Sequence, residues 1–223
     1  MAIRQYHFTI AFSVPHENAI LTFLPLTGNE WDCKADGFSN PIRGQAARRD
    51  EIKTNIKEQL DILQGTECAF CGLDLRSRVA QIEHIAPKGA GLHPQFMFEK
   101  QNLILACSLC NGFEKKHTFN TIISLGATYA ACTFNIVHPY FDDPNDHFEY
   151  ESDPDNGLAY LIQVKKNDGV ESSKGRQSVD LFELDSVPMT QERYKDALLA
   201  TFEVPDFENL INLVKQNSYV SRS

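Results

Sequence analysis

The sequence AQIEHIAPKG occupies residues 80–89 and holds the pattern that decides the fold. A strand-like apolar run ends here at the adjacent Glu83 and His84, and Pro87 then turns the chain. A strand buried on both faces would exclude this pair, because polar groups without partners are costly to remove from water. Successive side chains of a strand point to opposite faces, so the pair suits the end of a strand. The stretch therefore predicts a polar site where a short strand meets a turn.

Two Cys-x-x-Cys pairs flank this stretch, Cys68 with Cys71 and Cys107 with Cys110. Four thiolates satisfy a tetrahedral zinc ion and leave no open coordination position, so the pattern predicts a structural zinc site. Zinc would add folding free energy to a segment with short strands and many turn residues. A redox dithiol and buried unreactive thiols are the alternatives. The 35 residues between the pairs exceed a compact ribbon spacing, so we expect an inserted element.

The residues around the second cysteine pair extend the pattern. Glu-His-Ile-x-Pro at Glu83 is followed by Asn-Leu-x-Leu-x-Cys-x-x-Cys-Asn, which begins at Asn102 and ends at Asn111. This order resembles the HNH nucleases, also called ββα-metal or His-Me finger nucleases, in the form pinned by a four-cysteine zinc site. The match covers residues 66–118. It implies an α+β fold with a zinc-pinned, treble-clef-like ββα-metal nuclease module and flanking helices.

The resemblance implies a role for each matching residue. His84 would be the general base that takes a proton from the water attacking the scissile phosphorus. Glu83 and Asn111 would each give an oxygen ligand to a catalytic Mg²⁺ or Mn²⁺ ion. Asn102 would hold the loop between the two strands so that His84 is oriented. The implied activity is a metal-dependent endonuclease that hydrolyses phosphodiester bonds in DNA or, on the same scaffold, in RNA.

The sequence departs from the family pattern at Asn111, where the family name has a histidine. This changes the type of ligand and leaves the cation preference open. If a helix follows, Glu114 and Lys115 lie on roughly the same side as Asn111. Either could then join the site, Glu114 as an extra metal ligand or Lys115 as a contact to phosphate. We expect His117 at the surface or on a DNA backbone, and His93 as a solvent-exposed bystander.

Periodicity and turn residues divide the chain into three segments. Residues 1–65 form an N-terminal segment that is irregular, with at most a short strand, until an amphipathic helix over 48–64. Gly65 is expected to end that helix in the left-handed conformation. Residues 66–118 form the nuclease module, with two strands and one helix.

Residues 119–223 form a C-terminal extension. It is expected to contain a helix then a strand over 119–137, an irregular loop or linker over 138–157, and a strand at LAYLIQV. One or two helices over 189–216 should pack back on the module.

The segment IVHPYFDDPNDHFEY, residues 136–150, more weakly resembles a stretch of bacterial antiphage nucleases of the Septu and retron-associated type. This resemblance implies an ATPase protein partner and makes residues 119–223 a docking region. The alternative is structural: His138 and His147 cap turns, Tyr140 and Phe141 fill the core, and the acidic residues are solvated.

The charge of the chain is unevenly distributed. The formal net charge is −9, but residues 41–120 carry eleven basic and nine acidic side chains, a balance of +2. A polyanionic substrate is therefore compatible with the cysteine module. The basic pairs Arg48-Arg49 and Lys115-Lys116 are each interpreted as solvated surface charges.

Composition bounds the class of protein. The 223 residues are 42% hydrophobic, enough for one sizeable core. Without an apolar run long enough to span a bilayer, and with paired cysteines, we expect a cytoplasmic protein with no membrane partner. Cys33 and Cys132 are expected to be small core residues. The rival to the nuclease is a non-catalytic zinc module that binds nucleic acid or a protein.

Overall fold

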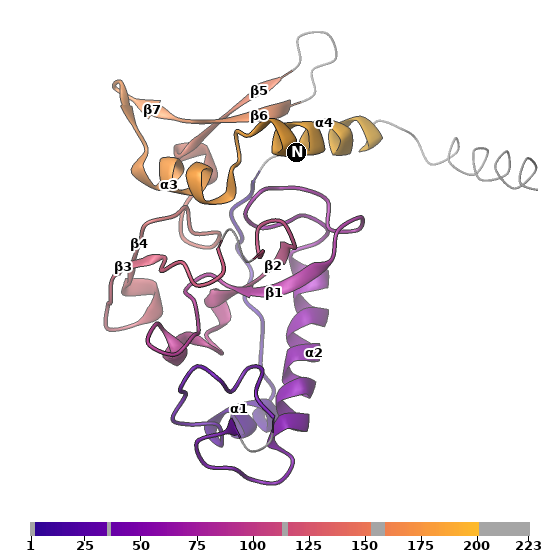
Figure 1. The fold of residues 1–223 in the computed structure, drawn as a ribbon, viewed down its shortest axis with the longest axis vertical. Coiled ribbons are helices and arrows are strands. Elements are labelled where there is room, and N and C mark those ends of the chain that lie inside the picture. Colours follow the sequence, from indigo (N-terminus) through magenta and orange to yellow (C-terminus); the bar gives the residue numbers. More distant parts are fainter. Residues whose placement is uncertain (1–2, 35–36, 113–115, 153–158, 201–223) are drawn as a thin grey trace, which may run out of the picture.

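The computed structural model describes residues 3–34, 37–112, 116–152 and 159–200 as a mixed α+β fold (Figure 1). The helices in these ranges are α1 (Val14–Leu21), α2 (Gln45–Leu63), α3 (Ser173–Phe182) and α4 (Val187–Ala200). The strands form antiparallel pairs: β1 (Ala80–His84) with β2 (Leu103–Cys107), β3 (Ile122–Ser124) with β4 (Thr133–Phe134), β5 (Phe148–Ser152) with β6 (Ala159–Val164), and β7 (Lys166–Asn167) with β8 (Val170–Glu171).

The β1–β2 hairpin and its loop contain residues 80–89, with the adjacent Glu83 and His84 at the end of β1. Glu83 pairs with Ile104 and His84 with Leu103, so the polar pair lies at the end of the hairpin where the connecting loop begins. Every residue of β2 is buried, as expected for the apolar sequence LILAC. A long loop, residues 85–102, connects the strands and includes the short 3-10 helices Pro94–Phe96 and Lys100–Asn102.

Helix α2 lies beside this hairpin (Figure 1). The spacing of Ile52, Ile56, Leu60 and Leu63 predicted the apolar face of this helix. Ile52, Ile56 and Leu60 are fully buried, as predicted, but Leu63 in the last turn is 43% exposed. The helix begins at Gln45, three residues before the predicted start, and ends at Leu63. Gly65 follows with φ of 79°, the predicted left-handed stop.

Helix α1 was not predicted, because residues 1–47 were expected to be irregular. Ser13 caps it by accepting a hydrogen bond from the backbone of His16, and Pro15 lies in the first turn. A serine followed by a proline and Glu17 is an ordinary helix start, and it could have been identified from the sequence.

The expectations for residues 119–152 were wrong in two places. No α-helix occurs over 119–137, where β3, the short 3-10 helix Tyr129–Ala131 and β4 follow one another. Residues 138–157 were expected to be irregular, but β5 begins at Phe148 and pairs with β6. The predicted strand LAYLIQV is confirmed as β6. Helix α3 was not anticipated, and the predicted helix beyond residue 200 lies outside the described residues.

The helix expected after the second cysteine pair is not found among the described residues. Residues 108–112 and 116–118 form turns and bends, and residues 113–115 lie outside the described part. The complete ββα-metal arrangement therefore remains an expectation rather than an observation.

A small hydrophobic cluster that includes Ile122, Tyr129 and Phe134 lies at β3 and β4. The main hydrophobic core connects most of the other elements. Its members run from Ile3 in the N-terminal segment, through α2 and the hairpin, to Met189 in α4. The N-terminal segment crosses this core, where Tyr6 donates a backbone hydrogen bond to Pro139 at 2.8 Å. Within the described ranges, no helix combines the length and apolar character needed to cross a membrane.

Candidate functional site

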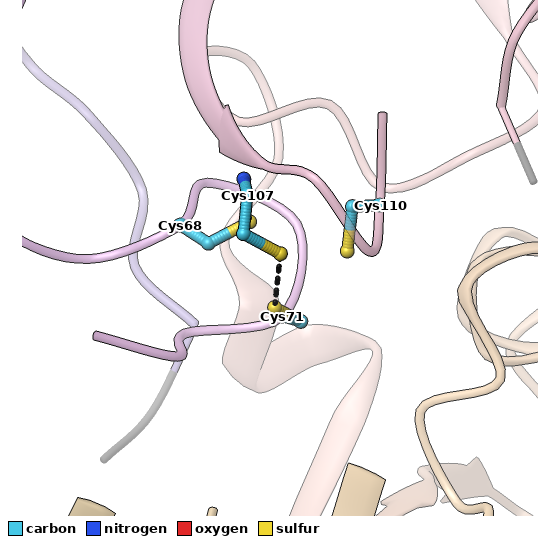
Figure 2. Close-up of side chains that lie close together, drawn as sticks. All are labelled: Cys68, Cys71, Cys107 and Cys110. Carbon is cyan, nitrogen blue, oxygen red and sulfur yellow. Dashed lines mark hydrogen bonds between the residues drawn. The ribbon is translucent and has the colours of Figure 1, made fainter. Parts of the chain in front are cut away.

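The two Cys-x-x-Cys turns bring their four thiols into one buried cluster, as Figure 2 shows. The ligand atoms of Cys68, Cys71, Cys107 and Cys110 all lie within 4.8 Å of one another. The Cys71 and Cys107 sulfurs are 3.7 Å apart, close to the roughly 3.8 Å between sulfurs around a tetrahedral zinc. Hydrogen bonds from Cys110, Cys68 and Cys71 lower the pKa of Cys107, and in turn the contact with Cys107 raises the pKa of Cys71 and of Cys110. The cluster is consistent with the predicted structural zinc site.

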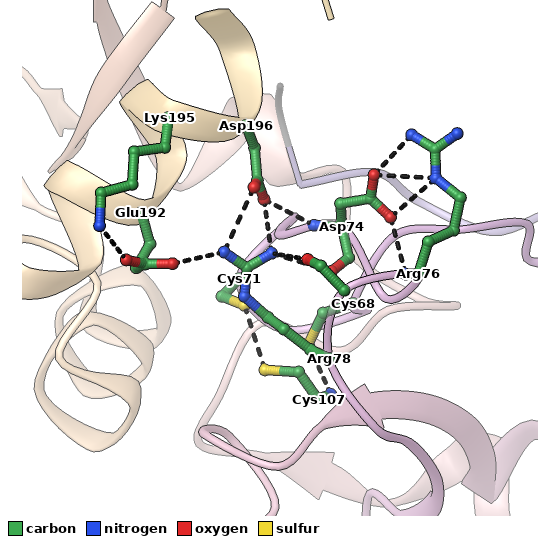
Figure 3. A network of polar contacts seen from close by, with 10 residues as sticks. Cys68, Cys71, Asp74, Arg76, Arg78, Cys107, Glu192, Lys195 and Asp196 are labelled. Atoms are coloured by element: carbon green, nitrogen blue, oxygen red, sulfur yellow. Dashed lines mark hydrogen bonds and ion pairs between the residues drawn. The ribbon is translucent and has the colours of Figure 1, made fainter. Parts of the chain in front are cut away.

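Helix α4 packs on the loop that follows the first cysteine pair (Figure 3). The Arg78 guanidinium donates to Asp196 and Glu192 at 2.7 Å each. Asp196 also accepts the backbone N–H of Asp74 at 2.9 Å. These contacts confirm that the last described helix packs back on the cysteine segment.

His84 ends β1 with one ring nitrogen occupied. Its Nε2 lies 3.0 Å from the carbonyl oxygen of Met97, which can only accept, so Nε2 carries the hydrogen and Nδ1 is the basic nitrogen. Within the described ranges Nδ1 has no hydrogen-bond partner, and it is not sealed from solvent. Trp31 packs edge-on against the ring at 4.4 Å. Burial, then the charges of Lys88 and Lys116, lower the pKa of His84 well below its ordinary value, which keeps the imidazole neutral.

Glu83 is held by a buried lysine. The Lys116 ammonium donates to Oε1 of Glu83 at 2.6 Å, and the Lys116 side chain is fully buried. The expectation that Lys116 is a solvated surface charge was wrong, because Glu83 supplies the partner that allows its burial. Arg49, also expected at the surface, is buried and donates to the carbonyls of Glu30 and Cys33.

Asn111 is half-buried, and its amide nitrogen donates to Oε1 of Gln81 at 2.7 Å. This orientation leaves the amide oxygen of Asn111 for another ligand. Glu114 and Lys115, which were expected near Asn111, lie outside the described residues.

Asn102 holds the loop that connects β1 and β2. Its amide nitrogen donates to Ala86 at 3.1 Å and Phe96 at 2.8 Å, and its oxygen accepts the N–H of Ala86 at 2.6 Å. The side chain is fully buried. The same loop supplies the Met97 carbonyl that binds His84. By holding the loop backbone, Asn102 therefore helps to position this carbonyl against the imidazole.

Tyr129 and His138 support the position of Asn102, a role that the sequence did not predict for either residue. The Tyr129 hydroxyl donates to Oδ1 of Asn102 at 2.8 Å and lies 3.0 Å from Nε2 of His138. Nδ1 of His138 accepts the backbone N–H of Tyr140, so Nε2 carries the hydrogen and donates to Tyr129. Burial, with a smaller effect from Lys174, lowers the pKa of His138 to about 3. No local sequence signal marks Tyr129, because its partners are distant in the chain.

Glu83, His84 and Asn111 line one pocket of about 830 Å³, called here the His84 pocket. Its opposite wall is formed by α2, and loops on either side complete it. The remaining lining residues are Trp31, Asp32, Lys53, Thr54, Lys57, Glu58, Asp61, Gln81, Ile82, Pro87, Lys88, Gly89, His117 and Thr118.

The charges of the His84 pocket are mixed. Three lysines and four carboxylates line it, and the lysines are Lys53, Lys57 and Lys88. Each lysine has a carboxylate partner: Lys57 binds Asp61 on its own helix, and the other two share Asp32. A cation and a phosphate would therefore each find ligands of the appropriate sign in this pocket.

The comparisons with known proteins agree with part of this interpretation. No protein-family model matches the chain. Septu protein PtuB of Bacillus thuringiensis is 24% identical over 165 residues, which cover 73% of this chain and 53% of that protein. Septu protein PtuB of Bacillus mycoides (strain KBAB4) is 27% identical over 161 residues, which cover 64% and 51%. The chain is distantly homologous to PtuB.

The chain spans about half the length of these PtuB proteins. The antiphage relationship inferred from residues 136–150 is thus supported at the level of homology.

The remaining histidines differ in their outcome. His117 is exposed, as predicted, and lines the His84 pocket. His93 was expected to be solvent-exposed, but it is buried and its Nε2 lies 2.8 Å from Oδ1 of Asn120. His138 was interpreted as a turn cap, and its Nδ1 does accept the backbone N–H of Tyr140 in the turn that follows, while its Nε2 binds the buried Tyr129. Tyr140 fills the core as expected, and Cys132 is buried.

The oxygen donors that Glu83 and Asn111 bring to the His84 pocket match a hard divalent cation in chemical type. Oε2 of Glu83 and Oδ1 of Asn111 are oxygens that no described residue binds, and oxygen ligands suit Mg²⁺ and Mn²⁺. Lys116 already neutralises the carboxylate. We therefore expect Lys116 to weaken the affinity of this site for a cation.

Proposed function

We propose that this protein is a metal-dependent endonuclease and that the His84 pocket is its active site. The observation that carries the proposal is the state of His84: a neutral imidazole whose Nε2–H is bound by Met97, with Nδ1 available at a pocket lined by Glu83 and Asn111. A general base requires this combination of a fixed tautomer and an accessible basic nitrogen. The proposed substrate is DNA, with RNA as the alternative on the same chemistry.

In this mechanism Nδ1 of His84 takes a proton from the water that attacks the scissile phosphorus. The Met97 carbonyl stabilises the imidazolium that results, because its hydrogen bond to Nε2–H strengthens as the ring becomes charged. Asn102 keeps that carbonyl in position through its bonds to Ala86 and Phe96. Glu83 and Asn111 would hold a divalent cation, which supplies charge stabilisation to the phosphoryl oxygens when bound.

The homology to PtuB supports a place in an antiphage defence system. The family resemblance adds an ATPase protein partner, for which residues 119–223 would be the docking region. Helix α4 and the β5–β6 pair form a connected part of that region, since α4 packs against β6. We propose this region as the surface through which the partner controls the nuclease.

The rival function, a non-catalytic zinc module, is favoured by one observation. Lys116 occupies an oxygen of Glu83, the residue assigned to the catalytic cation. In a purely structural protein this ion pair would be permanent, and His84 would be a core histidine. A binding role would then leave the protein without any dependence on Mg²⁺ or Mn²⁺.

The test is cleavage of supercoiled plasmid by the purified chain with Mg²⁺ or Mn²⁺, with His84→Ala measured in parallel. We expect cation-dependent nicking or linearisation that falls by a factor of about 10² or more in His84→Ala. The matched control is His7→Ala, an exposed histidine outside the His84 pocket. Zinc content and melting temperature must be equal in all three proteins.

Cleavage that persists in His84→Ala would contradict the assigned base. No cleavage by the wild-type chain, alone or with the proposed ATPase partner added, would favour the non-catalytic zinc module.

A further inference from the structure

We propose that Lys53 and Lys88 form a phosphate-binding pair beside His84, and that the Asp32 carboxylate occupies this pair in the free protein. The proposal rests on the proposed function, because the ligand is a backbone phosphate of the nucleic acid substrate. It assigns substrate binding to Lys53 of α2, which lies outside the residues that the family resemblance covers, and to Lys88 of the loop after β1, to which the resemblance gives no role.

The two lysines converge on one carboxylate. Nζ of Lys53 lies 3.2 Å from Oδ1 of Asp32, and Nζ of Lys88 lies 3.2 Å from Oδ2. Lys53 and Lys88 are far apart in sequence, and Asp32 comes from a third segment. A phosphate diester also presents two anionic oxygens on one atom, so the same pair of ammonium groups can bind it.

The lysine pair is adjacent to the proposed base. Nζ of Lys53 lies 5.1 Å from the centroid of the Trp31 ring. The Trp31 ring in turn packs edge-on against the His84 ring, with 4.4 Å between the two ring centroids. These three residues and Lys88 all line the His84 pocket. A phosphate bound by the lysines would therefore lie in the same pocket as Nδ1 of His84.

The segment that carries Trp31 and Asp32 is held rigidly. Gly28 has φ of 107°, and a Cβ at this position would lie 2.3 Å from the backbone nitrogen of Ala90. The loop after β1 and the N-terminal segment are thus in direct backbone contact. Arg49 from α2 donates to the Glu30 carbonyl at 3.1 Å, which fixes the same segment against the helix. The positions of the two lysines are preorganised by these contacts.

Asp32 is a weakly held occupant. Its side chain is 67% exposed, and both contacts of 3.2 Å are longer than the 2.7–2.9 Å typical of strong charge-assisted bonds. Exposed ion pairs of this kind contribute little to stability, so a substrate phosphate can displace the carboxylate at small cost. Partial burial raises the pKa of Asp32, but the charges of Lys88 and Lys53 lower it overall, and the carboxylate is ionised at neutral pH.

The experiment is a fluorescence anisotropy titration of a short fluorescein-labelled DNA duplex with the full chain, without added Mg²⁺ or Mn²⁺, at several salt concentrations. Asp32→Asn should bind about tenfold more tightly than wild type, because both lysines are released. Lys53→Gln combined with Lys88→Gln should bind more weakly. Its dependence of log K on log salt should be shallower by about 2, one unit for each lost phosphate contact.

Matched variants separate this site from the effect of net charge. Asp180→Asn makes the same charge change in α3, where Asp180 pairs with Arg176. Lys166→Gln combined with Lys195→Gln removes two lysines whose side chains are 62% and 64% exposed, outside the His84 pocket. These controls should bind within a factor of about two of wild type.

The outcomes distinguish this inference from the nuclease proposal. If Asp32→Asn binds like Asp180→Asn, or the two double-lysine variants bind alike, the lysine pair is not a phosphate site even if plasmid cleavage succeeds. If the predicted pattern of binding is observed but no plasmid is cut, the phosphate site stands and the hydrolytic function fails. Absence of DNA binding by wild type and Asp32→Asn alike would overturn the inference.

Discussion

At the scale of single residues, Lys116 determines how Glu83 can act. A fully buried ammonium requires a partner, and Glu83 at 2.6 Å provides it inside the cysteine segment. The same carboxylate is assigned to a catalytic cation by the family resemblance. Both assignments hold together if the cation binds Oε2 of Glu83 while Lys116 keeps Oε1, or if the cation displaces Lys116.

Lys116→Met tests this relationship. Without the ammonium, the Glu83 carboxylate, whose side chain is 11% exposed, has lost its ion pair, so the free energy of unfolding should fall by about 3 kcal/mol in urea titrations. Added Mn²⁺ should then raise the melting temperature of Lys116→Met more than that of wild type, because the cation replaces the lost charge. Lys57→Met, at an exposed lysine paired with Asp61, should lose less than about 1 kcal/mol. Equal responses of the variant and wild type to Mn²⁺ would show that Glu83 is not a cation ligand.

At the scale of secondary structure elements, a polar contact joins α4 to the cysteine segment. The Asp196 side chain is 7% exposed and binds both the Arg78 guanidinium and the Asp74 backbone, whereas Glu192 is 34% exposed and divides its contacts between Arg78 and Lys195 on its own helix. The position of α4 should therefore depend mainly on Asp196. This position matters for the proposed docking region, because α4 also packs against β6.

Asp196→Ala should lower the free energy of unfolding by about 3 kcal/mol, since it leaves Arg78 with a weaker partner and the Asp74 N–H without its acceptor. Glu192→Ala removes the exposed half of the same contact and should cost less than about 1 kcal/mol. Chemical unfolding followed by circular dichroism measures both. A larger effect of Glu192→Ala would mean that the buried carboxylate is not what holds α4.

At the scale of the whole molecule, the four-cysteine cluster lies where several parts of the chain meet. Cys107 ends the fully buried strand β2, and Cys71 belongs to the loop bound by α4. All four cysteines are members of the main hydrophobic core, which also includes Ile3 and Met189. Loss of the cluster should therefore affect more than the cysteine segment.

The purified chain should contain one zinc per molecule by mass spectrometry of metals, and a strong zinc chelator should abolish its tertiary near-ultraviolet circular dichroism signal. Cys107→Ser should lose zinc and fold poorly. Cys132→Ser, at a buried cysteine outside the cluster, should retain both zinc and the signal. A fully folded, zinc-free Cys107→Ser protein would contradict a structural role for the metal.

Local patterns in the sequence were sufficient for several features. The spacing of the cysteine pairs predicted a cluster of four thiols, and the cluster is observed. The recurrence of Ile52, Ile56, Leu60 and Leu63 predicted the buried face of α2, correctly for all but the exposed Leu63, and Gly65 predicted the end of the helix. These features were readable because each depends on residues close together in the chain or on the strict geometry of a shared ligand set. The catalytic roles of His84, Asn102 and Asn111 stay predictions.

The sequence by itself thus determined the cysteine cluster, the main amphipathic helix, the hairpin strands and the distant relationship to PtuB. Only the tertiary structure decided which charges meet: Lys116 with Glu83, Lys53 and Lys88 with Asp32, and Arg78 with Asp196. The lysines looked like surface residues because a single charged side chain gives no local sign of burial. Its partner is brought to it from dozens of residues away by the packing of the core, and the free energy of that pairing depends on how much water the packing removes.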